Sequence, residues 1–314
     1  MKVSAAILVP LILSAGCGPS SPSIQGDFPL FYLMDVDTGE PSMVCCFLGA
    51  QGDALAAAGT RLLFLDRDVG FVKADVNLSS PIAHAASSPE GGYGLAVSGP
   101  LLHIVSNETY IQRQPLPLPA PGAFILPKPQ STLLVILCSD GTAVKVSTSN
   151  WEITAQGQTG ANNPGAAAMS SDGRYVFAGN AQGRVYRIST VDLSSEMTFQ
   201  APGAVTDFFP LPGQEMLMTV EGVSQVWAVD VNTGLHTESY DITAPAVAVC
   251  ATGDGRFIYA SVPGQGIVIV DILDNTIVTQ SNAFGSPADM AVNGNSTRAV
   301  ISCPDMLKVF MLQR

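Results

Sequence analysis

The stretch SSDGRYVFAGNAQGRVYRISTVD, residues 170–192, combines two turns with two short apolar segments. An Asp-Gly pair precedes alternating apolar residues, a Gly-containing turn interrupts them, and a second alternating segment completes the unit. Such turns are typical of connections between antiparallel strands, and a period of two is typical of half-buried strands. The stretch therefore predicts two neighbouring strands of one antiparallel sheet.

The same unit recurs along the chain. A close copy, DGRFIYASVPGQGIVIVDI, occupies 254–272, and diverged copies occupy 52–66, 91–106, 130–147, 213–231 and 295–312. The first strands of the copies are predicted to begin at steps of 39 to 42 residues, near Asp53, Tyr93, Thr132, Arg174, Glu215, Arg256 and Arg298. Seven units of about 41 residues, each with room for four short strands, predict an all-β fold, a seven-bladed β-propeller with four antiparallel strands per blade.

The composition agrees with a ring of thin sheets. Of the 314 residues, 47% are hydrophobic and only 13% are charged, and 30 glycines and 22 prolines supply many turns. Long apolar stripes at helical spacing are missing from the sequence. One four-stranded sheet cannot cover its own two apolar faces, whereas sheets stacked around an axis cover one another.

The two ends of the chain are predicted to meet in the last blade. The final copy supplies three strands before Arg314, and the segment PLFYLMDVD, 29–37, can supply the fourth, which makes residues 28–314 one domain. A competing observation is that MDVDTG, 34–39, resembles VDVNTG, 229–234, which the repeat assigns to a third strand and its turn. The even spacing of the units favours closure through the fourth strand.

The two best copies resemble the YVTN family of β-propeller repeats. The segments SSDGRYVFAGN…VYRISTVD and TGDGRFIYASV…IVIVDILDNTIV follow its consensus, which runs roughly S-P-D-G-R-Y-V-Y-V-T-N and then V-x-V-I-D-x-x-x-N-x-V. The resemblance implies a WD40/YVTN-like ring but no single activity. Because propeller lactonases and amine-dehydrogenase propellers are related to this repeat, it also implies two alternatives to a binding role, a lactonase-like hydrolase and an accessory subunit of a redox enzyme.

The N-terminus has the layout of a bacterial lipoprotein signal. One lysine, an apolar run from Val3 to Leu13 and small residues lead to Cys17, which resembles the lipidated cysteine of a lipobox, although Ser14 stands where leucine is favoured. The expected organisation is a signal peptide over 1–16 and a lipid-anchored tether over 17–27. Gly18 gives no aspartate-type inner-membrane retention signal, so the predicted location is the cell envelope, with the outer membrane favoured. An ordinary cleaved signal that releases a periplasmic protein is the alternative.

Charge and motifs argue against several classes of function. A net charge of −12 would repel phosphate backbones, so no nucleic-acid partner is expected. No haem-attachment CxxCH, P-loop or zinc-protease motif occurs in the sequence, and no cofactor, metal site or catalytic set is predicted. Adjacent Cys45 and Cys46 would face opposite sides of a strand, and Cys138, Cys250 and Cys303 are expected to be buried thiols.

The innermost strands should line the central channel. Counting back from each middle strand gives seven equivalent positions, Val44, His84, Ala123, Gly165, Asp207, Val247 and Asp289. Three of them are polar, and the predicted ligand-binding residues are therefore His84, Asp207 and Asp289, at similar height in the channel. An imidazole with two carboxylates could hold a small cation or a polar ligand, and it is also the only acid/base set that a lactonase could use. Hydrated polar side chains without a ligand are the alternative.

These features together predict a non-catalytic binding or scaffold propeller. The expected partner is a protein or a surface polymer of the envelope, and the membrane is reached through the lipid on Cys17. The two alternatives stated above are a lactonase-like hydrolase and an accessory subunit of a redox enzyme.

Overall fold

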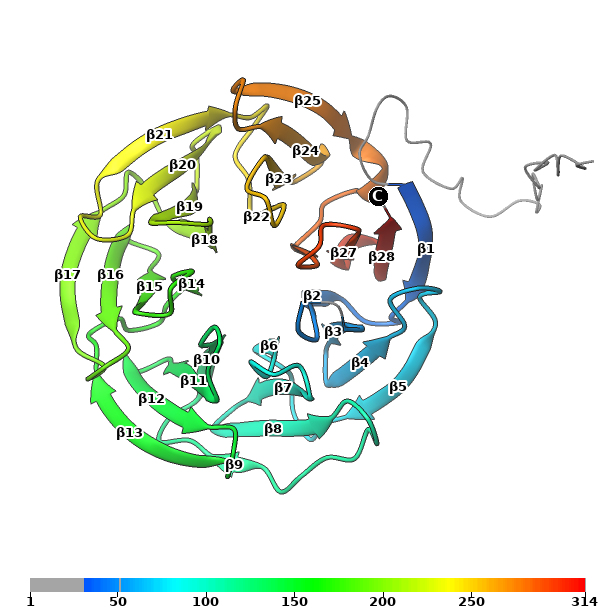
Figure 1. The fold of residues 1–314 in the computed structure, drawn as a ribbon. Helices are drawn as coiled ribbons and strands as arrows, with labels where there is room; N and C mark the ends of the chain where they lie inside the picture. The colour runs from blue at the N-terminus through cyan, green and yellow to red at the C-terminus, as the bar shows by residue number, and fades with distance from the viewer. Residues whose placement is uncertain (1–30, 51, 314) are drawn as a thin grey trace, which may run out of the picture.

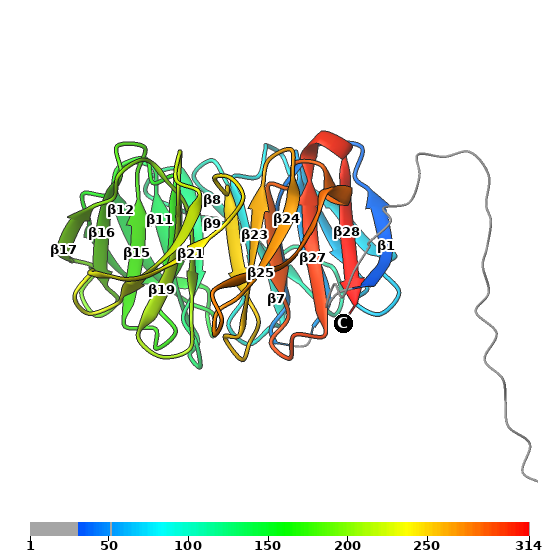
Figure 2. The same ribbon diagram turned by 90° about the horizontal axis from the view of Figure 1, so that it is seen from above.

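The ring of sheets is present. The computed structural model describes residues 31–50 and 52–313, which form seven separate four-stranded sheets. The sheets are arranged as blades around a central axis, with their strands running between the two faces of a flat cylinder (Figures 1 and 2). The seven-bladed, all-β prediction is confirmed. The predicted signal peptide, 1–16, the tether, 17–27, and the first residues of the 28–314 domain lie outside the described residues.

We number the blades by the order of their innermost strands along the chain. From the channel outward, blade 1 consists of β2 (Ser42–Phe47), β3 (Ala54–Ala58), β4 (Arg61–Leu65) and β5 (Val72–Asn77). Blade 2 consists of β6 (His84–Ser87), β7 (Tyr93–Ser98), β8 (Leu101–Ser106) and β9 (Leu116–Pro117). Blade 3 consists of β10 (Gly122–Pro127), β11 (Leu133–Cys138), β12 (Thr142–Ser147) and β13 (Glu152–Gln158). Blade 4 consists of β14 (Ala166–Met169), β15 (Tyr175–Gly179), β16 (Arg184–Ser189) and β17 (Ser195–Gln200). Blade 5 consists of β18 (Val205–Pro210), β19 (Glu215–Val220), β20 (Gln225–Asp230) and β21 (His236–Asp241). Blade 6 consists of β22 (Ala248–Ala251), β23 (Phe257–Val262), β24 (Gly266–Asp271) and β25 (Thr276–Ser281). Blade 7 consists of β26 (Asp289–Val292), β27 (Arg298–Cys303), β28 (Lys308–Gln313) and β1 (Phe31–Asp37). The described helical segments are two single 3₁₀ turns, η1 (Asn282–Phe284) and η2 (Pro304–Met306).

The outermost strand of blade 2 is much shorter than its equivalents. β9 has two residues, and it pairs with β8 only through Leu101↔Pro117 and Leu102↔Leu116. The segment before blade 3, QPLPLPAP, places proline at every second position. Proline has no backbone N–H to donate to a ladder, which limits it to such edges.

The hydrophobic core is divided among the contacts between blades. The buried apolar residues of the described chain form seven clusters, and each cluster draws its members from two adjacent blades. Strand β24 shows why, because all six of its residues are buried. Val268 and Val270 pack towards blade 5, whereas Ile267 and Ile269 pack towards blade 7. Alternate side chains therefore serve opposite neighbours, and a blade depends on both of them.

The chain closes the ring as the even spacing predicts. β1 pairs antiparallel with β28, so the fourth strand of blade 7 comes from the N-terminal end of the described chain (Figure 1). Asp35 lies opposite Phe310 in this ladder, and its carboxylate forms an ion pair with the Lys308 ammonium. The competing register, in which 34–39 would be a third strand with its turn, does not occur.

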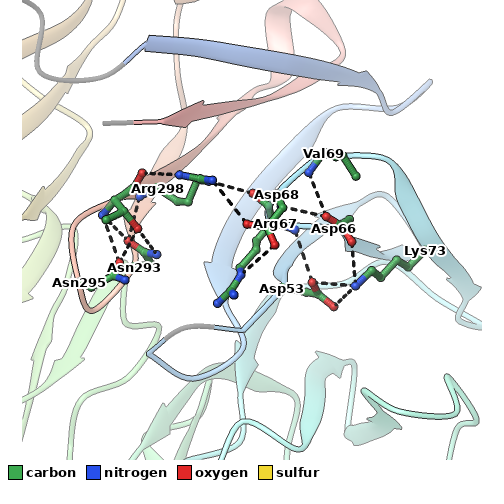
Figure 3. A network of polar contacts seen from close by, with 10 residues as sticks. Asp53, Asp66, Arg67, Asp68, Val69, Lys73, Asn293, Asn295 and Arg298 are labelled. Carbon is green, nitrogen blue, oxygen red and sulfur yellow. Dashed lines mark hydrogen bonds and ion pairs between the residues drawn. The ribbon is translucent and has the colours of Figure 1, made fainter. Parts of the chain in front are cut away.

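A polar network strengthens the seam between blades 7 and 1 (Figure 3). The Arg298 guanidinium donates to the Arg67 carbonyl at 3.1 Å and lies 3.4 Å from the Asp68 carboxylate. In the same turn of blade 1, the Lys73 ammonium lies 3.0 Å from Asp53 and 2.9 Å from Asp66. The turn that receives Arg298 is thus itself held by ion pairs.

The five described cysteines are free thiols. Cys45, Cys138, Cys250 and Cys303 are buried, and Cys46 is partly exposed, as expected for adjacent residues on opposite sides of β2. None of the helical turns within the described ranges has the length and hydropathy needed to traverse a bilayer.

Candidate functional site: the polar residues of the central channel

The three predicted site residues occupy one level of the channel. His84 on β6 pairs with Val97, Asp207 on β18 pairs with Thr219, and Asp289 on β26 pairs with Ser302. Each partner is the fifth residue of its middle strand, β7, β19 or β27. The three residues therefore occupy equivalent ladder positions, and their role in ligand binding stays a prediction.

The predicted equivalents in three other blades were wrong by one residue. The ladders place Phe124, Ala166 and Ala248 at this level, opposite Leu137, Gly179 and Ser261, instead of Ala123, Gly165 and Val247. The middle strands of these blades begin at Leu133, Tyr175 and Phe257, one residue later than the pattern suggested. Because side chains alternate along a strand, a one-residue slip exchanges the channel-facing residue for its neighbour.

Each of the three polar side chains connects two blades. The Asp207 carboxylate accepts a 2.8 Å hydrogen bond from the backbone N–H of Val249 in blade 6. The Asp289 carboxylate accepts an equal bond, 2.8 Å, from the N–H of Cys45 in blade 1. His84 Nδ1 accepts a longer bond, 3.4 Å, from the N–H of Ile125 in blade 3.

The donors are equivalent as well. Cys45, Ile125 and Val249 each follow the residue at the channel level of their own blade, so the same N–H of the innermost strand is used every time. The second oxygen of each carboxylate accepts from the next N–H along its own strand, that of Phe208 or Met290, at 2.8 Å. The described contacts thus show one link repeated three times around the channel.

His84 also packs against an aromatic side chain. Its ring centroid lies 5.0 Å from that of Phe124, the residue at the same level in the next blade. Burial lowers the pKa of His84 to about 4, so the imidazole is neutral near pH 7 and can accept a hydrogen bond. The imidazole is therefore held by a ring contact on one side and a backbone donor on the other.

Burial shifts the two carboxyl groups in the opposite direction and raises their pKa values. Burial, followed by repulsion from Asp289, raises the pKa of Asp207 to about 8. Burial raises the pKa of Asp289 to about 6, although its two backbone donors oppose the shift. Both shifts favour the neutral acid over the carboxylate.

The three residues border one cavity. It has a volume of about 330 Å³ and is lined mainly by apolar side chains of the innermost strands, among them Val44, Phe47, Ile125 and Phe209. The described contacts include no hydrogen bond from one of the three polar residues to another, and no group of three or more His, Cys, Asp or Glu within the described chain is placed to hold a metal ion. The cavity could admit a small ligand that hydrogen-bonds a neutral acid.

A second cavity, larger than that of the channel, lies elsewhere and was not anticipated. It has a volume of about 570 Å³ and is lined by residues of β16, β17 and the turn before β16. The sequence did contain a signal, because the turn AQGR in the opening stretch carries an amide side chain, but turn residues were considered only as strand boundaries.

Comparisons with known proteins support the fold and no more. No family model matches the chain, and no curated protein matches it. Among solved structures, a chain of the crystal structure of a mitotic checkpoint complex is similar, with a TM-score of 0.79 and 13% sequence identity over 99% of each chain. The likeness to YVTN repeats therefore stays a prediction.

Proposed function

We propose that this protein is a lipid-anchored binding ring of the bacterial cell envelope, which presents a rigid surface to a protein or a surface polymer and performs no catalysis. The observation that carries the proposal is the repeated link in the channel. The imidazole and both carboxyl groups, the acid/base set that the repeat brings to one level, each accept a hydrogen bond from a backbone N–H of the next blade. Their chemistry stabilises the ring.

The architecture supports a surface that changes little on binding. Every described interface between blades has its own buried cluster, and the seam has an additional polar network. Rigid scaffolds bind with a small loss of conformational entropy. The ring resembles in fold one chain of a mitotic checkpoint complex, which is an assembly of proteins, and a protein partner is in line with that likeness.

The anchor would join the ring at its rim. The described chain begins with β1, on the outer edge of blade 7 (Figure 1). An extended chain from a lipid on Cys17 to Phe31 would span at most about 50 Å. The ring would therefore stay near the membrane surface, with its two faces free to turn.

Capture from envelope membranes tests the proposal. The acylated full chain is compared with the Cys17→Ala chain, each carrying the same affinity tag. We expect membrane association to be lost in Cys17→Ala and a specific partner to be retained by both. Membrane association that is equal in the two chains would contradict the anchor. Substrate turnover by the purified ring that disappears with the channel residues would contradict the binding role.

A lactone hydrolase is the second candidate, and one observation favours it. Asp207 has a raised pKa, to about 8, and borders a cavity, which is a combination found in catalytic acids. Sugar lactones offered to the wild type and to His84→Ala separate the two functions. Turnover that falls at least about a hundredfold in His84→Ala would establish the hydrolase, whereas equal rates or no turnover would leave the binding ring.

A further inference from the structure

A polar groove runs along the outer part of blade 4. The 570 Å³ cavity shares Asn180, Gln182 and Tyr186 with a neighbouring cavity of about 300 Å³, so the two are continuous. We call this feature the blade 4 groove. Its polar lining is dominated by five amide side chains, Asn162, Asn163, Asn180, Gln182 and Gln200. Its volume is within the range of about 300–1,000 Å³ that is usual for small-ligand sites.

Two of these amide side chains use only one of their two polar atoms in hydrogen bonds to the protein. Asn180 Oδ1 accepts from the backbone N–H groups of Gln182, at 3.1 Å, and Arg184, at 2.9 Å, which fixes the turn. Gln200 Nε2 donates to the carbonyl of Gln182 at 2.7 Å and to that of Ala201 at 3.1 Å. Within the described residues, the hydrogen bonds of these two side chains use Asn180 Oδ1 and Gln200 Nε2, and leave Asn180 Nδ2 and Gln200 Oε1 for a ligand. The groove thus offers positioned donors and acceptors.

Tyr186 provides an aromatic surface beside these amides. Its cross-strand partner is Thr198, which places both side chains on one face of the sheet, and the pair Arg184↔Gln200 continues that face. The Arg184 guanidinium carbon lies 5.7 Å from the centre of the tyrosine ring. Gly160 lies close by, since a Cβ there would be 3.7 Å from the ring edge. Tyr186 packs against the buried cluster between blades 3 and 4 and stays partly exposed.

The charge of the groove differs from that of the protein. The chain has 26 acidic residues, yet no carboxylate lines either cavity, and Arg184 is the one charged residue among the lining residues of the described chain. Uncharged amides both donate and accept hydrogen bonds, as sugar hydroxyls do. An aromatic face also packs well against the apolar C–H face of a pyranose ring. This chemistry matches a neutral glycan better than an ionic ligand.

We infer that the blade 4 groove binds a segment of a neutral oligosaccharide. Amides would bind its hydroxyl groups, and Tyr186 would pack against one sugar ring. The inference names the polymer partner of the proposed binding role and rests on that role. An extended peptide added to the outer strand β17 would use backbone hydrogen bonds instead and would be insensitive to the tyrosine ring.

Blade 6 provides a matched control. It also carries amides at its outer edge, with Gln280 Nε2 donating to Gln265 Oε1 at 3.1 Å. Val268, which pairs with Ala260, stands where Tyr186, which pairs with Ala178, stands in blade 4. Blade 6 therefore has amides without the aromatic surface.

Calorimetric titration of the full chain, with Cys17→Ala for solubility, tests the inference. The probes are four neutral hexasaccharides, of α-1,4-glucose, β-1,4-glucose, β-1,4-mannose and β-1,4-N-acetylglucosamine, with oligogalacturonate as the charged comparison. We expect at least one neutral hexasaccharide to bind with millimolar or tighter affinity, and oligogalacturonate to bind at least tenfold more weakly. We expect Tyr186→Ala to weaken that binding at least tenfold, Asn162→Ala and Gln182→Ala to weaken it several-fold, and Tyr186→Phe and Gln265→Ala to leave it within twofold.

The controls separate a folding defect from a lost contact. Unfolding curves of Tyr186→Ala and Tyr186→Phe show whether each variant is folded at the titration temperature, and the two exposed amide variants test the groove independently of the tyrosine. No binding of any neutral hexasaccharide, or binding that persists in Tyr186→Ala and the amide variants, would overturn the inference. A protein partner captured from membranes by a chain that binds no glycan would leave the proposed function standing while the groove assignment fails.

Discussion

The Asp289 carboxylate accepts a 2.8 Å hydrogen bond from the backbone N–H of Cys45, a residue 244 positions earlier in the chain. This bond joins the innermost strand of the last blade to that of the first. It is one of three equivalent links, and the others join His84 to Ile125 and Asp207 to Val249. Polar side chains in the channel therefore contribute to holding the ring closed.

Loss of the link at the seam should destabilise the ring. Asp289→Ala leaves the N–H of Cys45 without its acceptor in a buried site, which costs about 1–3 kcal/mol. The free energy of unfolding in urea, measured at pH 5, checks this, because the carboxyl is then mostly protonated and removal of a buried charge offsets little of the loss. Asp274→Ala, at an exposed turn, is the control and should change stability by less than about 0.5 kcal/mol. Equal stability of the two variants would refute the role of the link.

The pH dependence of stability should depend on Asp207. Its pKa is raised from 3.8 to about 8 on folding, so the native state holds a proton that the unfolded state releases. The resulting contribution is fully present below pH 3.8 and is lost as the pH rises through 8. His84 acts in the opposite direction, since its pKa falls from 6.5 to about 4 on folding. Its contribution to stability therefore increases as the pH rises from 4 to 6.5 and changes little above pH 6.5.

Between pH 6.5 and 8 the effect of His84 is complete, and the difference in slope between the wild type and Asp207→Asn isolates Asp207. Wild-type stability is expected to fall in this interval, and Asp207→Asn, which keeps an acceptor but cannot titrate, should reduce the slope. Urea unfolding at four pH values across the interval measures it, with Asp274→Asn as the matched control. An unchanged slope in Asp207→Asn would show that the carboxyl does not retain its proton on folding.

Removal of β1 should open the last blade. Without residues 31–37, β28 loses its ladder partner and the Lys308 ammonium loses Asp35. An uncovered edge strand promotes association between chains. We expect the shortened chain to unfold at lower temperature and to elute as oligomers in gel filtration, and a peptide of residues 28–40 to reverse both effects. A shortened chain that remains monomeric with unchanged thermal stability would contradict closure through this strand.

The thiols of Cys45, Cys46, Cys138 and Cys250 should be unreactive in the folded ring. Burial raises the pKa of Cys46 to about 12 and that of Cys138 to about 11, and it raises the pKa values of Cys45 and Cys250 well above the ordinary value. Because the thiolate is the reactive form, a thiol reagent at pH 8 should modify these residues only after unfolding. Mass spectrometry before and after denaturation counts the modified sites in the Cys17→Ala chain. Rapid modification of Cys46 in the native protein would indicate an open channel with easy solvent access.

The sequence predicts the ring well because local turns and alternating strands repeat at one spacing. It predicts strand starts less well, since Arg174 and Arg256 follow an Asp-Gly pair and precede an aromatic residue, so nothing local decides whether they belong to the turn or to the strand. That ambiguity produced the errors at Gly165 and Val247.

The links between blades could not be predicted from the repeat. His84, Asp207 and Asp289 were found as polar residues at one channel level, but their partners are backbone N–H groups of other blades. Those groups come within reach only through the packing of neighbouring sheets. The blade 4 groove was missed for a related reason, because its lining joins the turn before β16 to the loop after β13.

Amide hydrogen exchange tests the linking role of the channel residues most directly. In the folded wild type, the N–H groups of Cys45, Ile125 and Val249 should exchange slowly. Asp289→Ala should accelerate exchange at Cys45 alone, His84→Ala at Ile125 alone, and Asp207→Ala at Val249 alone, with the remaining two amides unchanged in each variant. Exchange that stays slow in all three variants, or that rises equally at all three amides whichever residue is replaced, would contradict the account.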